Sequence, residues 1–318
     1  LVSGGITRLT HAGLAIVEWQ PQVGAIPPMS EGDWRILFEK YQQTPEFREV
    51  NHAMDLAGFQ FIFWWEWAHR LSGRLIGIVF LLPYLWFLAR GTLRGGLAWK
   101  ALGFFVLGGL QGAMGWYMVK SGLVDDPRVS QYRLAAHLGL AFLIFGLMLW
   151  TALGMLGERR RALPGTSLRR VQGFGTFLVA LVFVMVLTGA LVAGIRAGLA
   201  YNTFPSMNGH FVPPEILMLE PWWLNFFANM ATVQFDHRMI AWALMGLIPV
   251  LWWLVRCHGP AAAYRPANLL AGMLAVQVAL GIATLLLKVP VPLAAAHQAG
   301  AMVLFGLLVW TNHALRLK

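Results

Sequence analysis

The sequence predicts an all-α, polytopic membrane helix bundle built from two similar halves. Three observations support this prediction: an apolar composition, several long apolar stretches, and two matched pairs of histidines. Of the 318 residues, 58% are hydrophobic and 12% are charged, whereas about 25% are charged in an ordinary soluble domain. A bilayer core about 30 Å thick needs roughly 20 apolar residues in each helical span. The composition therefore indicates a membrane protein before any motif is considered.

Seven stretches of the chain are long and apolar enough to span a bilayer. They cover residues 71–89, 101–119, 134–156, 172–195, 237–255, 267–287 and 294–314. The motif Ala-Gly-Leu-Ala at 12–15 recurs at 197–200, just after the fourth stretch. By this repeat, residues 1–8 resemble the end of a helix whose body precedes the sequence, although a cleaved signal peptide is an alternative. We therefore expect four helices in each half, the first of them largely missing.

The repeat extends to the later helices and predicts an N-terminal half, 1–165, and a C-terminal half, 166–318. A Gln-x-x-x-Gly motif at 111–115 in the second stretch matches one at 277–281 in the sixth. In each half a short turn and a histidine-bearing helix follow. Small residues at such positions let helix backbones approach closely in lipid, and packing alone accounts for most of them.

Four histidines are the candidate metal ligands of the chain. His69 and His137 lie near the starts of the first and third apolar stretches, and His237 and His297 lie at the same positions in the second half. A neutral imidazole is a good axial ligand for haem iron, and two facing helices that each offer one can hold the porphyrin between them. The sequence therefore predicts two haem sites, one in each half.

Charged residues accompany these histidines. Glu66 precedes His69 by three positions, which is one helical turn, so the carboxylate and the imidazole project from the same face. The corresponding stretch of the second half carries an amide at Gln234, so only the first half has a carboxylate poised beside its ligand. Such a group is a candidate functional residue, although a cap or an arginine partner would also explain it. Arg70 and Arg238 each follow a histidine directly, and each can meet a haem propionate or anchor at lipid headgroups.

Basic residues in the short loops predict the orientation of the chain. The loops after the first, third and fifth stretches and the C-terminus contain Glu158 as their single acid together with Arg90, Arg94, Lys100, Arg159, Arg160, Arg161, Arg169, Arg170, Arg256, Arg265, Arg316 and Lys318. By the positive-inside rule these ends face the cytoplasm or matrix. We then expect the four histidines in the outer first turns of their helices, with both haem sites toward the periplasm or intermembrane space. The net charge of +10 reflects this asymmetry, so lipid rather than nucleic acid is the expected partner.

Two outer segments, 8–65 and 201–232, are too long to be simple turns. Their aromatic and amphipathic runs predict short interfacial helices that cover the two sites. The other histidines are expected to be solvated or interfacial rather than ligands, and they are His11, His52, His210, His258 and His313. Cys257 is the single cysteine, so no disulfide can form within this sequence.

Several motifs together closely resemble one family. They run from Gly4 to Thr10, Gly13 to Trp19, Pro45 to Phe47, Ile62 to Arg70, Tyr201 to Pro205, Phe235 to Arg238 and Ala296 to Gln298. In this order they resemble haem A synthase, in its alphaproteobacterial and mitochondrial branch. The resemblance covers essentially the whole chain, and a motif set of this length is far more specific than any one histidine-containing fragment.

The resemblance implies an oxidoreductase that converts the C8 methyl of haem O to the formyl of haem A, the cofactor of cytochrome oxidases. It implies that His237 and His297 hold a resident haem b that passes electrons, while His69 and His137 address the substrate haem O in the N-terminal half. Glu66 matches the family's essential carboxylate, which could shuttle protons or stabilise a cationic intermediate.

The resemblance also implies a multi-pass protein of the bacterial inner membrane, or of the mitochondrial inner membrane in a eukaryote. Haem O synthase and cytochrome oxidase assembly factors are the implied partners, together with an unidentified electron acceptor, and a homo-oligomer is compatible with it. Two other function classes remain open from the residues alone. A diheme electron-transfer cytochrome would explain the four histidines without Glu66, and a haem transporter or chaperone would explain the covering segments without catalysis.

Overall fold

The computed structural model describes residues 1–18, 23–122, 129–156 and 165–316. Over these ranges the chain is helical, and they contain no β-strand beyond one isolated bridge between Met207 and His210. Seven helices are long and apolar enough to cross a membrane, which confirms the predicted polytopic all-α bundle. These helices are α4 (Leu56–Ala89), α5 (Gly95–Gly122), α6 (Gln131–Leu156), α7 (Thr166–Gly194), α10 (Met230–His258), α11 (Tyr264–Leu286) and α12 (Val291–Ala314).

Each predicted apolar stretch coincides with one of these helices, but the helices begin earlier than expected. Helix α4 begins at Leu56 rather than at residue 71. Its start is set by Asp55, whose side chain accepts a hydrogen bond from the amide of Gly58 at 2.8 Å. Helix α10 begins in the same way after Asn229, which caps the amides of Ala231 and Thr232. The predicted spans were bounded by hydropathy, whereas a helix begins at the residue that caps its backbone amides, so the helices are longer than the predicted spans.

The earlier starts correct the expected depth of the histidines. All four were expected in the first turns of their helices, and none lies there. At 3.6 residues per turn, His69 falls in the fourth turn of α4 and His237 in the third turn of α10. His137 and His297 fall in the second turns of α6 and α12. The imidazoles therefore lie deeper along their helices than the apolar windows suggested.

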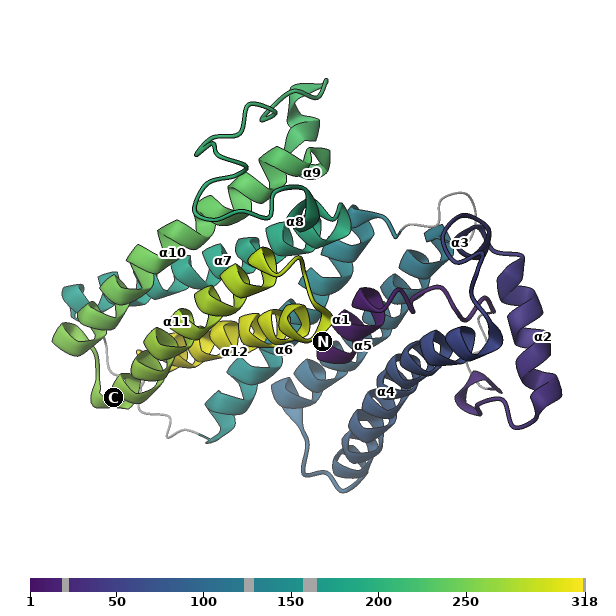
Figure 1. Cartoon of the computed structure of the whole chain (residues 1–318). Coiled ribbons are helices and arrows are strands. Elements are labelled where there is room, and N and C mark those ends of the chain that lie inside the picture. Colours follow the sequence, from purple (N-terminus) through teal and green to yellow (C-terminus); the bar gives the residue numbers. More distant parts are fainter. Residues whose placement is uncertain (19–22, 123–128, 157–164, 317–318) are drawn as a thin grey trace. The chain divides into compact units, whose positions relative to one another are not determined.

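The chain divides into two compact units, Leu1–His137 and Leu138–Lys318. In the first unit, α4 packs against α5, against the short helix α1 (Val2–Leu9) and against α2 (Glu31–Gln42) of the outer segment (Figure 1). Thr7 Oγ1 on α1 donates to the carbonyl of Trp65 on α4 at 3.2 Å. The predicted short helices of this outer segment are present as α2 and α3 (Pro45–Glu49).

An aromatic core attaches the outer segment to α4. Helix α2 starts with a capping box between Ser30 and Asp33, which favours a helix at this position. Tyr41 from α2 stacks on Phe59 from α4, with ring centroids 5.2 Å apart. Trp34 packs edge-on against Phe63 at 4.9 Å. Since Tyr41 and Phe59 are fully buried, the outer segment is a packed cover over the start of α4.

In the second unit, α7, α10, α11 and α12 pack in a closed ring, each helix contacting the next (Figure 1). This is the four-helix half that the repeat predicts. Buried side chains along the bundle include Leu178, Ile248, Leu270 and Leu308. The outer segment of this unit contains α8 (Ala197–Ala200) and α9 (Asn225–Ala228), both of which pack against α10.

A shared backbone turn supports the internal repeat. His11 and Arg196 stand directly before the two Ala-Gly-Leu-Ala motifs, and both have left-handed backbones, with φ of 54° and 57°. This conformation costs a non-glycine residue roughly 1–2 kcal/mol. The surrounding structure must therefore hold it in place, and it does so at the same position of the repeat in both halves. The chain therefore leaves α1 and α7 through equivalent turns. The division into halves at 165 and 166 stays a prediction.

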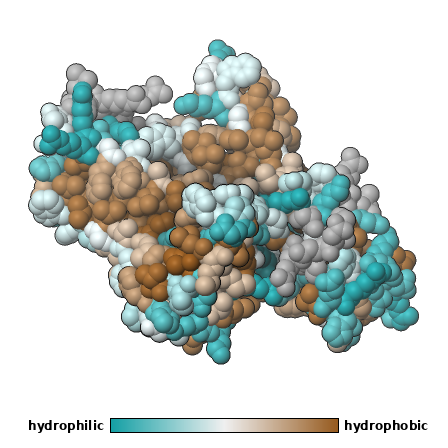
Figure 2. Space-filling view, turned by 90° about the horizontal axis from the view of Figure 1, so that it is seen from above, coloured by the Kyte–Doolittle hydropathy of each residue, from teal (hydrophilic) through white to brown (hydrophobic). Residues whose placement is uncertain are grey.

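Large apolar side chains cover much of the helix surface. Ile76, Val79, Trp99 and Leu156 are each more than two-thirds exposed, and Figure 2 shows broad hydrophobic areas with hydrophilic residues toward the margins. Exposed apolar surface of this extent is expected where lipid covers the protein. Among the loop residues used for orientation, 158–161 and Lys318 lie outside the described residues.

Candidate functional site

Each of the four candidate histidines packs its ring on a glycine of a neighbouring helix. A Cβ added to the glycine would approach the imidazole Cε1 to between 2.9 and 3.2 Å. The pairs are Gly4 with His69, Gly115 with His137, Gly189 with His237, and Gly281 with His297. At Gly4 and Gly281 a Cβ would force the ring to move, and at Gly115 and Gly189 it would press on the ring, so the glycines favour these ring positions.

Two glutamines hold the backbone of the histidines on α6 and α12. Gln111 Nε2 donates to the carbonyl of His137 at 3.0 Å, and Gln277 Nε2 donates to the carbonyl of His297 at 3.0 Å. The same nitrogens lie 3.2 and 3.1 Å from the Nδ1 atoms of these rings. Packing alone was the expected role of the Gln-x-x-x-Gly repeat. In the structure its glutamine hydrogen-bonds to the histidine of the next helix and its glycine packs against the ring of that histidine.

Two hydroxyl groups contact the histidines on α4 and α10. Ser3 Oγ on α1 is 3.1 Å from His69 Nδ1, and Thr188 Oγ1 on α7 is 2.9 Å from His237 Nδ1. Sequence reasoning missed both residues. The available signal was a hydroxyl-glycine dipeptide that precedes the Ala-Gly-Leu-Ala motif by the same spacing in each half.

The predicted pairs of histidines are together in the structure. His69 on α4 and His137 on α6 both belong to the first unit. His237 on α10 and His297 on α12 both belong to the second unit. The described residues contain no cluster of three or more histidine, cysteine, aspartate or glutamate side chains suited to a metal ion. A haem needs only two axial ligands because the porphyrin supplies the others.

Buried amide oxygens without a partner lie beside His137 and His297, which is compatible with an additional bound group at each histidine pair. Gln111 Oε1 and Gln277 Oε1 are buried and have no hydrogen-bond partner within the described part of the chain. A Cβ at Gly300 would collide with Gln277 Oε1, so the backbone leaves room for this amide. Two imidazoles in glycine cradles, with polar amides beside them, are a donor set that suits a bis-histidine haem.

Glu66 is a buried carboxylate surrounded by donors. It is 2% exposed, and its Oε1 accepts from Arg70 Nη2 at 2.6 Å and Nε at 3.0 Å. Its Oε2 accepts the backbone N–H of Ile16 at 2.8 Å. Glu66 and the Arg70 guanidinium therefore form a buried ion pair one turn from His69.

The second unit has the same arrangement without the carboxylate. Gln234 stands three positions before His237, and its Nε2 donates to the carbonyl of Tyr201 at 2.9 Å. Arg238 Nη2 donates to that carbonyl at 2.9 Å, as Arg70 Nη2 donates to the carbonyl of Ile16 at 2.9 Å. Ile16 and Tyr201 both follow an Ala-Gly-Leu-Ala motif. Gln234 is therefore the structural counterpart of Glu66.

Arg70 and Arg238 both tie the outer segments to their helices. Arg70 reaches the carbonyls of Ile16 and, at 3.5 Å, Glu18. Arg238 reaches the carbonyl of Tyr201 and, at 3.2 Å, that of Ser206. These contacts give each arginine a positioning role, and a contact with a haem propionate stays a prediction.

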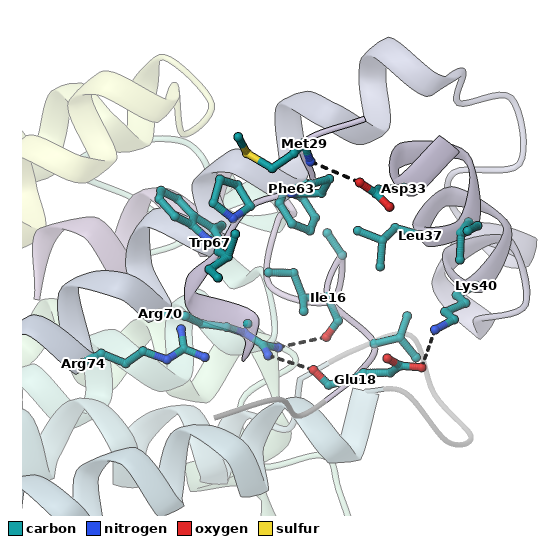
Figure 3. A pocket seen from close by; sticks show the side chains of 17 residues that line it. Ile16, Glu18, Met29, Asp33, Leu37, Lys40, Phe63, Trp67, Arg70 and Arg74 are labelled. Atoms are coloured by element: carbon teal, nitrogen blue, oxygen red, sulfur yellow. Dashed lines mark hydrogen bonds and ion pairs between the residues drawn. The ribbon is translucent and has the colours of Figure 1, made fainter. Parts of the chain in front are cut away.

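A cavity of about 380 Å³ lies between the outer segment and α4 in the first unit. Its wall is mainly apolar, with Leu37, Phe63 and Trp67 among the lining residues, and Arg70 and Arg74 border one side (Figure 3). An ion pair between Lys40 and Glu18, at 2.7 Å, also lines it. The packed cover therefore leaves one cavity, which two arginines of α4 border.

A second buried carboxyl lies in the same cover. Glu46 is 5% exposed, and Tyr41 Oη donates to its Oε2 at 3.4 Å while Asn51 Nδ2 donates to Tyr41 Oη at 2.7 Å. Burial, with the negative charge of Glu66, raises the pKa of Glu46 to about 8. Glu46 therefore keeps its proton at neutral pH, unlike an ordinary surface glutamate.

The remaining histidines are not grouped with these sites. His11, His52, His210 and His258 are exposed, as expected. His313 is a correction, because it is buried on α12 and packs edge-on against Trp150 with ring centroids 4.9 Å apart. Its position in the last turn of α12 predicted an interfacial side chain, but packing against Trp150 of α6 buries His313.

Comparison with known proteins assigns the chain to a family. Residues 1–309 match COX15-CtaA, described as cytochrome oxidase assembly protein. A protein of Nitrosospira multiformis named heme A synthase is 59% identical over 317 residues, which cover 99% of this chain and 89% of the relative. Proteins of the same name from Nitrosomonas eutropha and Parvibaculum lavamentivorans are 52% and 48% identical, and the matches cover 98% and 99% of this chain and 88% and 90% of the relatives. The chain therefore belongs to the COX15-CtaA family of cytochrome oxidase assembly proteins.

Proposed function

We propose that this protein is a haem A synthase that oxidises the C8 methyl group of haem O to the formyl group of haem A. The observation that carries the proposal is the pair of matched histidine sites that differ three positions before the histidine, with Glu66 in one unit and Gln234 in the other. The name shared by its relatives supports the same reaction. Two similar sites with one distinct carboxylate suit a protein that keeps one haem and modifies another.

His237 and His297 would hold a resident haem b, and His69 and His137 would bind the substrate haem O. The glycine cradles and the unpartnered amide oxygen beside each pair support a haem at both pairs, and Glu66 beside the first pair alone supports placing the substrate there. The resident haem would supply one-electron transfer to and from the reacting site. With water as the source of oxygen, conversion of a methyl to a formyl group releases four protons and four electrons (R–CH3 + H2O → R–CHO + 4 H⁺ + 4 e⁻), so an electron acceptor is required.

The residues of the first unit would bind and stabilise the reacting group. Glu66 provides a negative charge that Arg70 and the Ile16 amide hold in place, which would stabilise positive charge developing at the oxidised carbon. A carboxylate in this place can also accept a released proton. The packed cover of α2 and α3 would keep bulk water from the site.

Two alternative functions make different demands on the molecule. A diheme electron-transfer cytochrome needs both histidine pairs but gives no reason for Glu66 in place of Gln234. A haem transporter would use the covering segments but would release the haem unchanged. The charge difference between otherwise matched sites therefore favours the synthase.

The decisive test is the mass of the haems extracted from the purified protein and from cells that express it with a source of haem O. We expect haem b in the purified protein, and haem A together with its alcohol intermediate in extracts. Methyl, alcohol and formyl forms differ in mass, so each is identified directly. Two unmodified haems b would favour the cytochrome, and release of unchanged haem O would favour the transporter.

We further propose that the histidine sites lie toward the periplasmic side of a bacterial inner membrane, where haem O synthase and cytochrome oxidase assembly factors would be the partners. This orientation places exposed Cys257, at the end of α10, on the cytoplasmic side. A membrane-impermeant maleimide should label Cys257 in inside-out vesicles and not in intact spheroplasts. Met218→Cys, in the outer segment with Cys257 replaced by Ser, should give the reverse pattern. Labelling of Cys257 in intact spheroplasts would show that the proposed orientation is wrong and that Cys257 faces the periplasm.

A further inference from the structure

Two hydroxyl groups stand at equivalent places in the two units, and the proposed function does not use them. Thr188 Oγ1 is 2.9 Å from His237 Nδ1, and Ser3 Oγ is 3.1 Å from His69 Nδ1. In both cases the next residue is the glycine on which the same ring packs. One dipeptide therefore provides both the surface under the ring and a polar partner for one ring nitrogen.

The contacts of Thr188 decide which way its hydrogen bonds run. Its hydroxyl has one hydrogen and two polar neighbours, His237 Nδ1 and the carbonyl oxygen of Met185, which is 2.9 Å away. A carbonyl oxygen can only accept. Both contacts are satisfied when the hydroxyl donates to Met185 and accepts from His237 Nδ1–H. A neutral imidazole carries one hydrogen, so Nε2 keeps the lone pair that a metal requires.

The position of Thr188 is set by packing rather than by its hydroxyl. Helix α7 buries Leu178, Val182 and Val186 along the face that packs against its neighbours. Its backbone is therefore fixed independently of the contact with His237. Removal of the hydroxyl should leave the helix in place and take away one of two polar neighbours of the ring, the other being the backbone of Met185.

We propose that Thr188 is a positioning residue that fixes the Nδ1–H tautomer and ring orientation of His237, and that Ser3, at the equivalent place beside His69, orients that ring. The inference rests on the proposed function, because it takes Nε2 of each ring as the haem ligand. A ligating histidine that donates its other N–H has a fixed orientation and is a more basic ligand, and loss of that partner typically lowers metal affinity about 10- to 100-fold.

The test compares Thr188→Val, which keeps the shape and removes the hydroxyl, with Thr188→Ser, which keeps the hydroxyl. Both are purified with the resident haem, and its reduction potential and its rate of transfer to apomyoglobin are measured. We expect Thr188→Val to release haem about 10- to 100-fold faster. The reduction potential of its haem should rise by about 59 mV for each factor of ten by which the affinity for ferric haem falls more than the affinity for ferrous haem. Thr188→Ser should restore both values.

Thr151→Val is the matched control, because Thr151 is a half-buried threonine on α6 whose hydroxyl also bonds to its own helix, at Leu147. It should leave the potential and the transfer rate unchanged. A Thr188→Val protein with wild-type values for both would overturn the inference. If that variant does not fold, ¹⁵N NMR of histidine-labelled wild-type apoprotein decides, since an Nε2–H tautomer at His237 excludes the proposed bond.

These outcomes are separable from failure of the proposed function. If the extracted haems include no haem A while Thr188→Val still shifts the resident haem, the function is wrong and the positioning role stands. If haem A is made and Thr188→Val behaves as wild type, the function stands and the positioning role is wrong.

Discussion

Glu66→Gln should retain the resident haem and stall the oxidation of haem O. The substitution keeps the size of the side chain and one acceptor oxygen for Arg70, but it removes the negative charge and the oxygen that accepts the Ile16 N–H. Loss of a proton-transferring or charge-stabilising group typically costs about 10² to 10⁴ in rate. The measurement is the ratio of haem A to haem O in extracts of cells that express the variant and the wild type at matched protein levels.

The chain itself indicates that this substitution is structurally tolerable. Gln234 lies at the equivalent position beside Arg238 and donates to the carbonyl of Tyr201. A glutamine at position 66 could donate to the carbonyl of Ile16 in the same way. Glu31→Gln is the matched control, because Glu31 is an exposed carboxylate paired with Arg35 on α2. It should keep the wild-type ratio. A wild-type ratio in Glu66→Gln would show that the carboxylate is structural and that the reactive group lies elsewhere.

Replacement of either His237 or His297 by alanine should abolish the low-spin haem b spectrum of the purified protein. Both rings are needed for six-coordinate iron, and each alanine also empties the space above Gly189 or Gly281. The absorption spectrum of the reduced protein and its haem content per polypeptide measure the loss.

His258→Ala is the control for these variants, since His258 is exposed at the end of α10 and should keep the full spectrum. His69→Ala should also keep the resident haem, because it changes only the other unit. Unchanged six-coordinate spectra in both His237→Ala and His297→Ala would contradict the assignment of the resident site.

The sequence by itself determined the fold class and the candidate ligands. Apolar length is a local property, so the seven spans are visible without any knowledge of how the helices pack. The recurrence of Ala-Gly-Leu-Ala and of Gln-x-x-x-Gly indicated a repeat, and the one-turn spacing of Glu66 and His69 placed them on one helical face. Each of these inferences depends on residues near one another along the chain.

Only the tertiary structure decided what these residues contact. Helical periodicity tells which side chains share a face, but not which face of another helix they meet. The contact between Thr188 and His237 joins residues 49 positions apart, and the bond from the Ile16 amide to Glu66 joins residues 50 positions apart. The depth of His69 was also hidden, because the cap at Asp55 and the packing of α2 start α4 at Leu56, well before the predicted span. Burial of His313 against Trp150 has the same cause, since packing between distant segments overrides the local hydropathy of a helix end.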